Sequence, residues 1–181
     1  MRYAPRVISA LMVIGGFAGS TAVASVEPPE AITQHIKAIA EAATASDVIA
    51  AYAAGLALDR RDVTLHEAYL RRMVDLGRAD VLGYQAQLLI SLEPGNGLAW
   101  AVVAFGHADR GEFAEAFSAI RRAVKRLPED EFVANLAGQM VGWYDREGNE
   151  SALAEILRPD VARLRAELGK NKAFRAGYKV V

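Results

Sequence analysis

"GLAWAVVAFGHADRGEFAEAFSAIRRAVKRLPED", residues 97–130, is the stretch that decides the fold. It holds an aromatic residue near its start, a lone glycine in its middle, and a proline near its end. Two helix-length segments, 97–109 and 112–126, flank the glycine. Gly111 permits a tight turn that a Cβ would hinder, and Pro128 stops the second helix. The stretch therefore predicts two antiparallel helices joined by a short turn.

The same spacing recurs along the chain. Gly77 and Gly111 are 34 residues apart, and so are Pro94 and Pro128. A fixed period of this length is typical of helical hairpins that stack, because each hairpin buries its apolar face against the next one. The chain is therefore predicted to be built from repeats.

The unit 97–130 resembles the tetratricopeptide repeat family. The residues that match the family's aromatic, small, turn and closing positions are Trp100, Ala104, Gly111, Phe113, Ala116, Ala123 and Pro128. Weaker copies occupy 63–96 and 131–157. The resemblance implies an all-α fold, a right-handed α-α superhelix in which antiparallel helix pairs form a short solenoid with degenerate terminal repeats. The repeat domain is expected to cover residues 30–168.

The remaining segments are also rich in helix-forming residues, and no run alternates as a strand does. The expected helices are 30–43, 47–59, 65–76, 79–93, 97–109, 112–126, 130–145, and two shorter ones separated at Pro159. Ser46 is expected to cap the second helix, and Thr64 with Glu67 to form a capping box on the third. The tail, 169–181, has little periodicity and is expected to be partly mobile.

The first residues have the pattern of a secretory signal peptide. Arg2 and Arg6 precede an apolar run, which ends at the small triplet Ala22-Val23-Ala24. This order predicts a signal peptide at 1–24, cleaved after Ala24, followed by a linker at 25–29. The alternative is an uncleaved membrane anchor. We expect an exported protein, periplasmic or secreted, with no membrane span after the signal.

Composition restricts the partners. Removing Arg2 and Arg6 with the signal leaves 19 Lys and Arg against 22 Asp and Glu, so no global charge favours nucleic acid. The chain has no cysteine, so neither disulfides nor thiolate metal sites are available to it. The segment from residue 158 onward carries seven Lys or Arg against two acidic residues. This basic tail suits weak contact with an anionic surface; the alternative is a solvated tail.

Catalytic motifs are missing from the sequence. Its three histidines, His35, His66 and His107, form no H-x-x-x-H pair, and no phosphate-binding loop or G-x-S-x-G turn occurs. The stretch "RRAVKR" (121–126) ends a predicted helix, where the helix dipole favours cations. We therefore expect no enzyme activity, no cofactor and no metal.

The family resemblance implies a concave groove lined by the first helix of each repeat, where a peptide or helix binds. By register, the groove face is Glu67, Arg71, Val74, Ala101, Phe105, Ala108, Asn135, Gln139 and Trp143. The alternative is that these are ordinary helix residues, with Phe105 and Trp143 in the core. Some family members hold a C-terminal carboxylate with lysine and asparagine at two of these positions. The pairs present here, such as Ala101 with Phe105, depart from that clamp.

Two functions follow from these observations. The first is an exported non-enzymatic scaffold whose groove binds another exported or envelope protein or peptide. The second is a structural or self-assembly role, with the groove occupied by the chain's own N-terminal helix, residues 30–43.

Ala116→Phe tests the predicted helix crossing. Two helices cross closely only where side chains are small, so a phenylalanine at this position overpacks the crossing and lowers the free energy of unfolding by about 1 to 3 kcal/mol. The check is a thermal or denaturant unfolding curve. An unchanged curve contradicts the repeat assignment.

Overall fold

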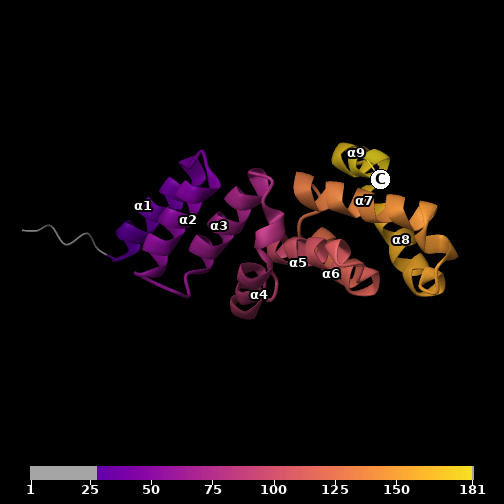
Figure 1. Cartoon of the computed structure of the whole chain (residues 1–181), viewed down its shortest axis with the longest axis horizontal. Coiled ribbons are helices and arrows are strands. Elements are labelled where there is room, and N and C mark those ends of the chain that lie inside the picture. The colour runs from indigo at the N-terminus through magenta and orange to yellow at the C-terminus, as the bar shows by residue number, and fades with distance from the viewer. Residues whose placement is uncertain (1–27, 181) are drawn as a thin grey trace, which may run out of the picture.

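The computed structural model describes residues 28–180, which form nine α-helices and two short 3-10 turns and contain no strand (Figure 1). The helices are α1 (Pro28–Glu41), α2 (Ala45–Leu56), α3 (Val63–Asp75), α4 (Gly83–Leu92), α5 (Gly97–Asp109), α6 (Phe113–Arg126), α7 (Glu131–Arg146), α8 (Ala154–Leu168) and α9 (Lys172–Val180). The prediction of an all-α fold is confirmed for these residues. The predicted signal peptide, 1–24, lies outside them.

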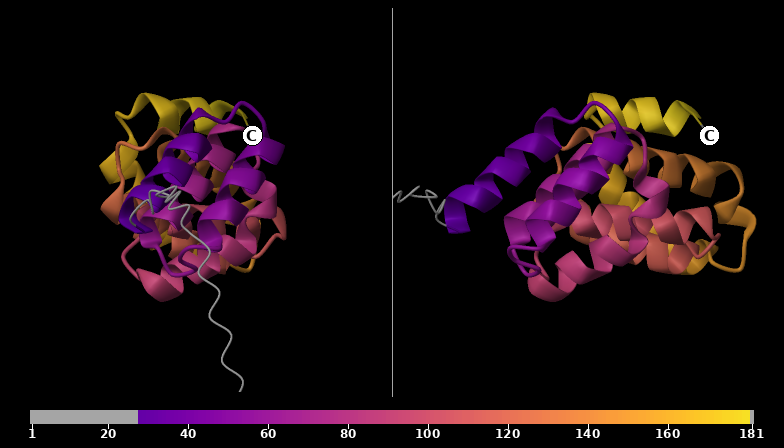
Figure 2. Two further views of the ribbon diagram at one scale, coloured as in Figure 1. Left: turned by 90° about the vertical axis from the view of Figure 1, so that its left-hand side faces the viewer. Right: turned by 60° about the vertical axis from the view of Figure 1, so that its left-hand side comes forward.

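The helices follow one another in a row, from α1 to α3 at one end to α7, α8 and α9 at the other (Figures 1 and 2). From α1 to α8, helices next to each other in sequence pack together, most extensively α5 with α6 and α1 with α2. In addition, α1 packs on α3, α3 on α5, and α5 on α7. Each helix pair is thereby placed against the pair before it.

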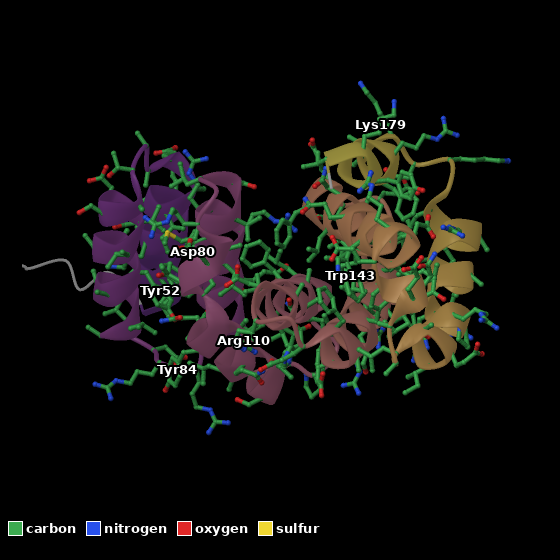
Figure 3. All side chains as sticks on the ribbon, turned by 45° about the vertical axis from the view of Figure 1, so that its right-hand side comes forward. Tyr52, Asp80, Tyr84, Arg110, Trp143 and Lys179 are labelled. Atoms are coloured by element: carbon green, nitrogen blue, oxygen red, sulfur yellow. The ribbon has the colours of Figure 1, made fainter. Side chains whose placement is uncertain are left out.

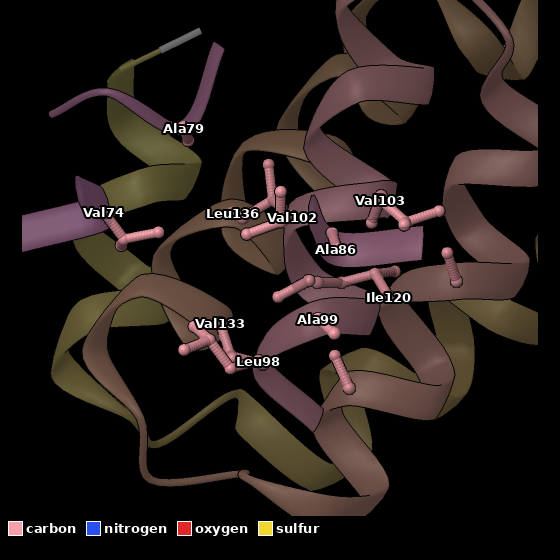
Figure 4. Close-up of a cluster of buried hydrophobic side chains, with 14 of the residues drawn as sticks. Val74, Ala79, Ala86, Leu98, Ala99, Val102, Val103, Ile120, Val133 and Leu136 are labelled. Carbon is pink, nitrogen blue, oxygen red and sulfur yellow. The ribbon is translucent and has the colours of Figure 1, made fainter. Parts of the chain in front are cut away.

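The pair α5 and α6 forms the centre of the molecule. The predicted small residues Ala104, Ala116 and Ala123 are all fully buried there. One continuous cluster of buried apolar side chains runs through this region, with Val102 from α5 and Ile120 from α6 among its members (Figure 4). Burial of the three alanines agrees with the helix crossing expected from the sequence.

The two glycines that set the repeat spacing adopt the conformation that requires glycine. Gly77 has φ of 72° and Gly111 has φ of 74°, in the left-handed region that other residues rarely adopt. Each follows directly on the C-cap residue of its helix, Leu76 for α3 and Arg110 for α5. The predicted glycine turns are therefore present at both positions.

Two predicted caps are wrong by two residues. Thr44, not Ser46, accepts a hydrogen bond from the main chain at the start of α2, at 3.2 Å. Asp62, not Thr64, accepts one from Leu65 N at the start of α3, at 2.7 Å. A cap residue needs extended backbone just before the helix. Because each helix begins earlier than expected, Ser46 and Thr64 lie inside its first turn.

Pro159 does not divide the last segment into two helices, as the sequence predicted. It lies inside α8, which is continuous over Ala154–Leu168. A proline removes one helical hydrogen bond, the one to the residue four positions earlier. Here that residue is Glu155, in the first turn, and both residues are exposed to water. The loss is therefore tolerated at this end of the helix.

The prediction of a partly mobile tail at 169–181 differs from the structure over residues 172–180, which form helix α9 and pack along α7 (Figure 2). Phe174 and Gly177 are buried in this contact. A Cβ on Gly138 of α7 would lie 2.1 Å from the Phe174 carbonyl oxygen. A Cβ on Gly177 would lie 2.0 Å from the carbonyl oxygen of Asn135. The two backbones therefore touch, and glycine is required on both helices.

Gly138→Ala is expected to destabilise this crossing, because its methyl group meets backbone that cannot rotate away. The expected loss in the free energy of unfolding is about 1 to 3 kcal/mol, as for other overpacking substitutions. Denaturant unfolding measures it.

Gly106→Ala in α5 is the matched control, since a Cβ there meets only the end of the flexible Arg110 side chain, at 3.3 Å. It removes a glycine from another helix interior and is expected to stabilise the chain by about 0.5 to 1 kcal/mol. Equal effects from the two substitutions would show that α9 is not held in this way.

Candidate functional site

A pocket of about 240 Å³ opens between α5, α6 and α7. Its walls are mainly apolar and aromatic, and they consist of Phe105, Ala108, Asp109, Phe113, Leu136, Gln139, Met140 and Trp143. Four of these were predicted as groove residues: Phe105, Ala108, Gln139 and Trp143. The structure therefore brings together residues from two consecutive units of the predicted repeat.

Aromatic stacking fixes the wall formed by Trp143, whose position is labelled in Figure 3. The Trp143 ring lies parallel to the Phe113 ring, with 3.4 Å between centroids and 7° between planes. Gly148, in the turn after α7, also lies against the indole, and a Cβ there would come within 2.7 Å of the ring. Phe105 packs in a tilted orientation against Phe132, at 6.5 Å. The pocket is thus preformed by contacts between side chains.

Phe105 and Trp143 serve two purposes at once. Both are only partly buried, and both pack against the main apolar core. The alternative of core packing and the hypothesis of a binding surface are thus compatible for these two rings. An aromatic side chain held on one face and open on the other is suited to anchoring an apolar group.

Three other predicted groove residues do not line this pocket. Ala101 is fully buried, so it is not accessible to a partner, and its assignment to the groove face is wrong. Val74 is also buried. Asn135 lies beneath α9: its amide donates to the Ala173 carbonyl at 3.4 Å and accepts from Gln139 at 2.7 Å. Helix α9 therefore covers part of the predicted groove.

The two charged residues that were predicted for the groove on α3, Glu67 and Arg71, do not line this pocket either. Arg71 forms an ion pair with Asp130 at 2.7 Å. Asp130 is also the N-cap of α7, because its other carboxylate oxygen accepts from Val133 N at 3.0 Å. Arg71 thus links α3 to the start of α7, whereas Glu67 is exposed. This arrangement gives Arg71 a structural role.

Four pocket residues were not predicted as groove residues: Leu136, Met140, Asp109 and Phe113, the last of which was predicted only as one of the family's aromatic positions. The pocket residues of α7 follow the three- and four-residue spacing of one helix face: Leu136, Gln139, Met140 and Trp143. Since Gln139 and Trp143 were predicted, the same spacing indicated the other two. That signal was present in the sequence. Asp109 is exposed at the end of α5 and carries no comparable pattern.

The fully buried histidine, His66, holds α2 against α3. Its Nε2 lies 2.9 Å from the Arg60 carbonyl, which only accepts, so Nε2 carries the hydrogen. Nδ1 therefore accepts from the Tyr52 hydroxyl, at 2.6 Å. Burial raises the pKa of Tyr52 to about 12, which keeps this hydroxyl protonated. The pair has its hydrogen bonds satisfied and acts as a clamp between helices.

Within residues 28–180, no three histidine, cysteine or carboxylate side chains gather in the way that a metal ion needs. None of the described helices has the length and apolar character needed to cross a bilayer. No family model, curated protein or solved structure matches the chain.

Asp130→Ala is expected to lower the free energy of unfolding by about 0.5 to 2 kcal/mol, because it removes a helix cap. Arg71→Met is expected to cost less, about 0 to 1 kcal/mol, because it removes only a half-exposed ion pair. Urea unfolding of both variants measures the difference. Because Asp130→Ala removes the ion pair as well as the cap, an equal loss from the two variants would show that the ion pair, and not the cap, dominates.

Proposed function

We propose that this chain is a tetratricopeptide-like solenoid that acts as a non-enzymatic scaffold and binds an exported protein or peptide. The observation that carries the proposal is the preformed aromatic pocket between α5, α6 and α7. It lies on first-helix faces of two consecutive units, where the family resemblance locates a binding groove. Export itself rests on the pattern of residues 1–24.

Three features support the solenoid. The glycines at the 34-residue spacing both adopt positive φ at helix ends. The first helices of the units, α3, α5 and α7, pack on one another in sequence order. The aromatic Phe113 of one unit stacks on Trp143 of the next. Stacked repeats need such contacts between neighbours, because each repeat alone leaves an apolar face uncovered.

The chemistry of the pocket indicates the partner. Its walls are aromatic and aliphatic, and a volume of about 240 Å³ admits one bulky apolar side chain. An anchor of this kind contributes most of the binding energy in many interfaces. Asp109 at the edge offers one carboxylate to a donor on the partner. We therefore assign the pocket to a single large apolar residue of the bound segment.

The second function predicted from the sequence, in which the N-terminal helix fills the groove, differs from the structure. Helix α1 packs on α2 and α3, at one end of the row of helices and away from α5, α6 and α7, which line the pocket (Figure 1). The helix that covers part of the predicted groove face is α9, and it leaves the Phe105 and Trp143 pocket accessible. This difference favours binding over self-occupation.

Fluorescence of Trp143 tests the proposal. The chain contains two tryptophans, so Trp100→Phe leaves Trp143 as the single reporter. Peptides are first selected from a random displayed library on the chain from Ser25 onward. They are then titrated into the Trp100→Phe protein and two derivatives, Ala108→Phe and Ala53→Phe.

Ala108→Phe fills the pocket from its wall, whereas Ala53→Phe places the same side chain in a separate surface depression beside α2. Selected peptides are expected to share a bulky apolar residue, to change Trp143 emission, and to lose about tenfold or more in affinity with Ala108→Phe only, which corresponds to about 1.4 kcal/mol. Equal binding to both derivatives would refute the pocket, and so would a selection that enriches no common apolar residue.

A further inference from the structure

A second concavity, of about 410 Å³, lies between α6 and α8, away from the aromatic pocket. All of the residues that line it are charged, four of them basic and one acidic: Arg121, Arg122, Lys125, Arg163 and Glu167. None of these residues lines the aromatic pocket. We call it the basic pocket.

Two of its arginines are held in place by other residues. Arg121 forms an ion pair with Asp160 of α8, at 2.6 Å, and so ties α6 to α8. The guanidinium of Arg122 lies over the Trp100 ring, 4.3 Å from its centroid, in a cation–π contact. These contacts fix the positions of both groups without neutralising Arg122.

The other two cations, Lys125 and Arg163, have no acidic partner among the described residues. The lining contains four positively charged side chains and one negatively charged side chain, Glu167. When Asp160, the ion-pair partner of Arg121, is also counted, the net charge of the group is +2. Like charges gathered around one concavity repel each other, and an anion placed among them removes that repulsion.

The helix dipole does not explain this gathering. It favours cations in the last turn of a helix, and Lys125 is the one lining residue that lies in the last turn of α6. Arg121 and Arg122 are farther from that end, and Arg163 belongs to the middle of α8. The cluster arises because two helices present cations to the same space.

We propose that the basic pocket binds the phosphate group of a phosphorylated ligand. Guanidinium groups form paired hydrogen bonds with phosphate oxygens, and Lys adds a mobile point charge. An excess of two charges matches a phosphate monoester dianion. No aliphatic or aromatic residue is among those that line the pocket, so the rest of the ligand is expected to project outward, as a small soluble phosphate or a lipid headgroup does. The proposal is independent of peptide binding.

The test compares the full chain with Lys125→Gln/Arg163→Gln, which removes the two unpaired cations and keeps the contacts of Arg121 and Arg122. The control, Arg61→Gln/Lys170→Gln, removes the same charge from exposed positions outside the pocket. Glycerol 3-phosphate and pyrophosphate are titrated by calorimetry. Phosphatidylcholine vesicles with and without phosphatidic acid are used in sedimentation, and circular dichroism verifies folding.

The pocket variant is expected to bind at least one phosphate probe about tenfold or more weakly than the unaltered chain, because it loses charged hydrogen bonds. The control is expected to stay within about twofold, since distant charges are screened by salt. Binding of the soluble probes identifies a soluble ligand, and binding of phosphatidic acid vesicles alone identifies a headgroup.

Equal weakening in the pocket variant and the control would refute the proposal, because binding would then follow net charge alone. So would the absence of binding to every phosphate probe. A single-stranded oligonucleotide is included as a competing class of ligand, and binding to it that is unaffected in the pocket variant counts against the pocket.

Discussion

Close contact between helix backbones is the constraint on which the rest of this structure depends. At the centre, α5 and α6 pack together where Ala104, Ala116 and Ala123 are fully buried. This pairing fixes the start of α6, and Phe113 there stacks on Trp143 of α7. The aromatic pocket is therefore a consequence of helix spacing. Larger residues at the crossing would separate the helices and move both rings apart.

The same constraint acts more strongly between α7 and α9, where glycines on both helices bring main chain against main chain. Because Gly138 and Gly177 fix the position of α9, the helix covers Asn135 and contributes no residue to the pocket lining. In the proposed function, a groove covered by α9 at Asn135 favours recognition of one anchoring side chain over a long extended segment. Under the proposed binding function, the C-terminal helix therefore contributes to specificity without lining the pocket.

The sequence predicted the central hairpin well because its signals are local. Gly111 and Pro128 mark the ends of helices through their own backbone preferences, and the observed helices agree closely. The sequence pattern could not predict that the tail forms helix α9, because the residues of α7 against which α9 packs are more than thirty positions away in sequence. Ala101 was misplaced because α5 is apolar on nearly all sides, so its pattern does not show which face is exposed. The position of α9 and the burial of Ala101 are both determined by tertiary contacts, which a local sequence pattern does not contain.

Helix α6 takes part in both proposed sites. Its first residue, Phe113, lines the aromatic pocket, and Arg121 to Lys125 line the basic pocket about two turns later. Energetic coupling between sites requires an element with two alternative arrangements. Buried Phe117 and Ile120 lie between the two sets of residues and pack in the main core, which holds α6 in one position. We therefore expect a ligand in one proposed pocket to leave the affinity of the other unchanged, with α6 acting as a rigid spacer between them.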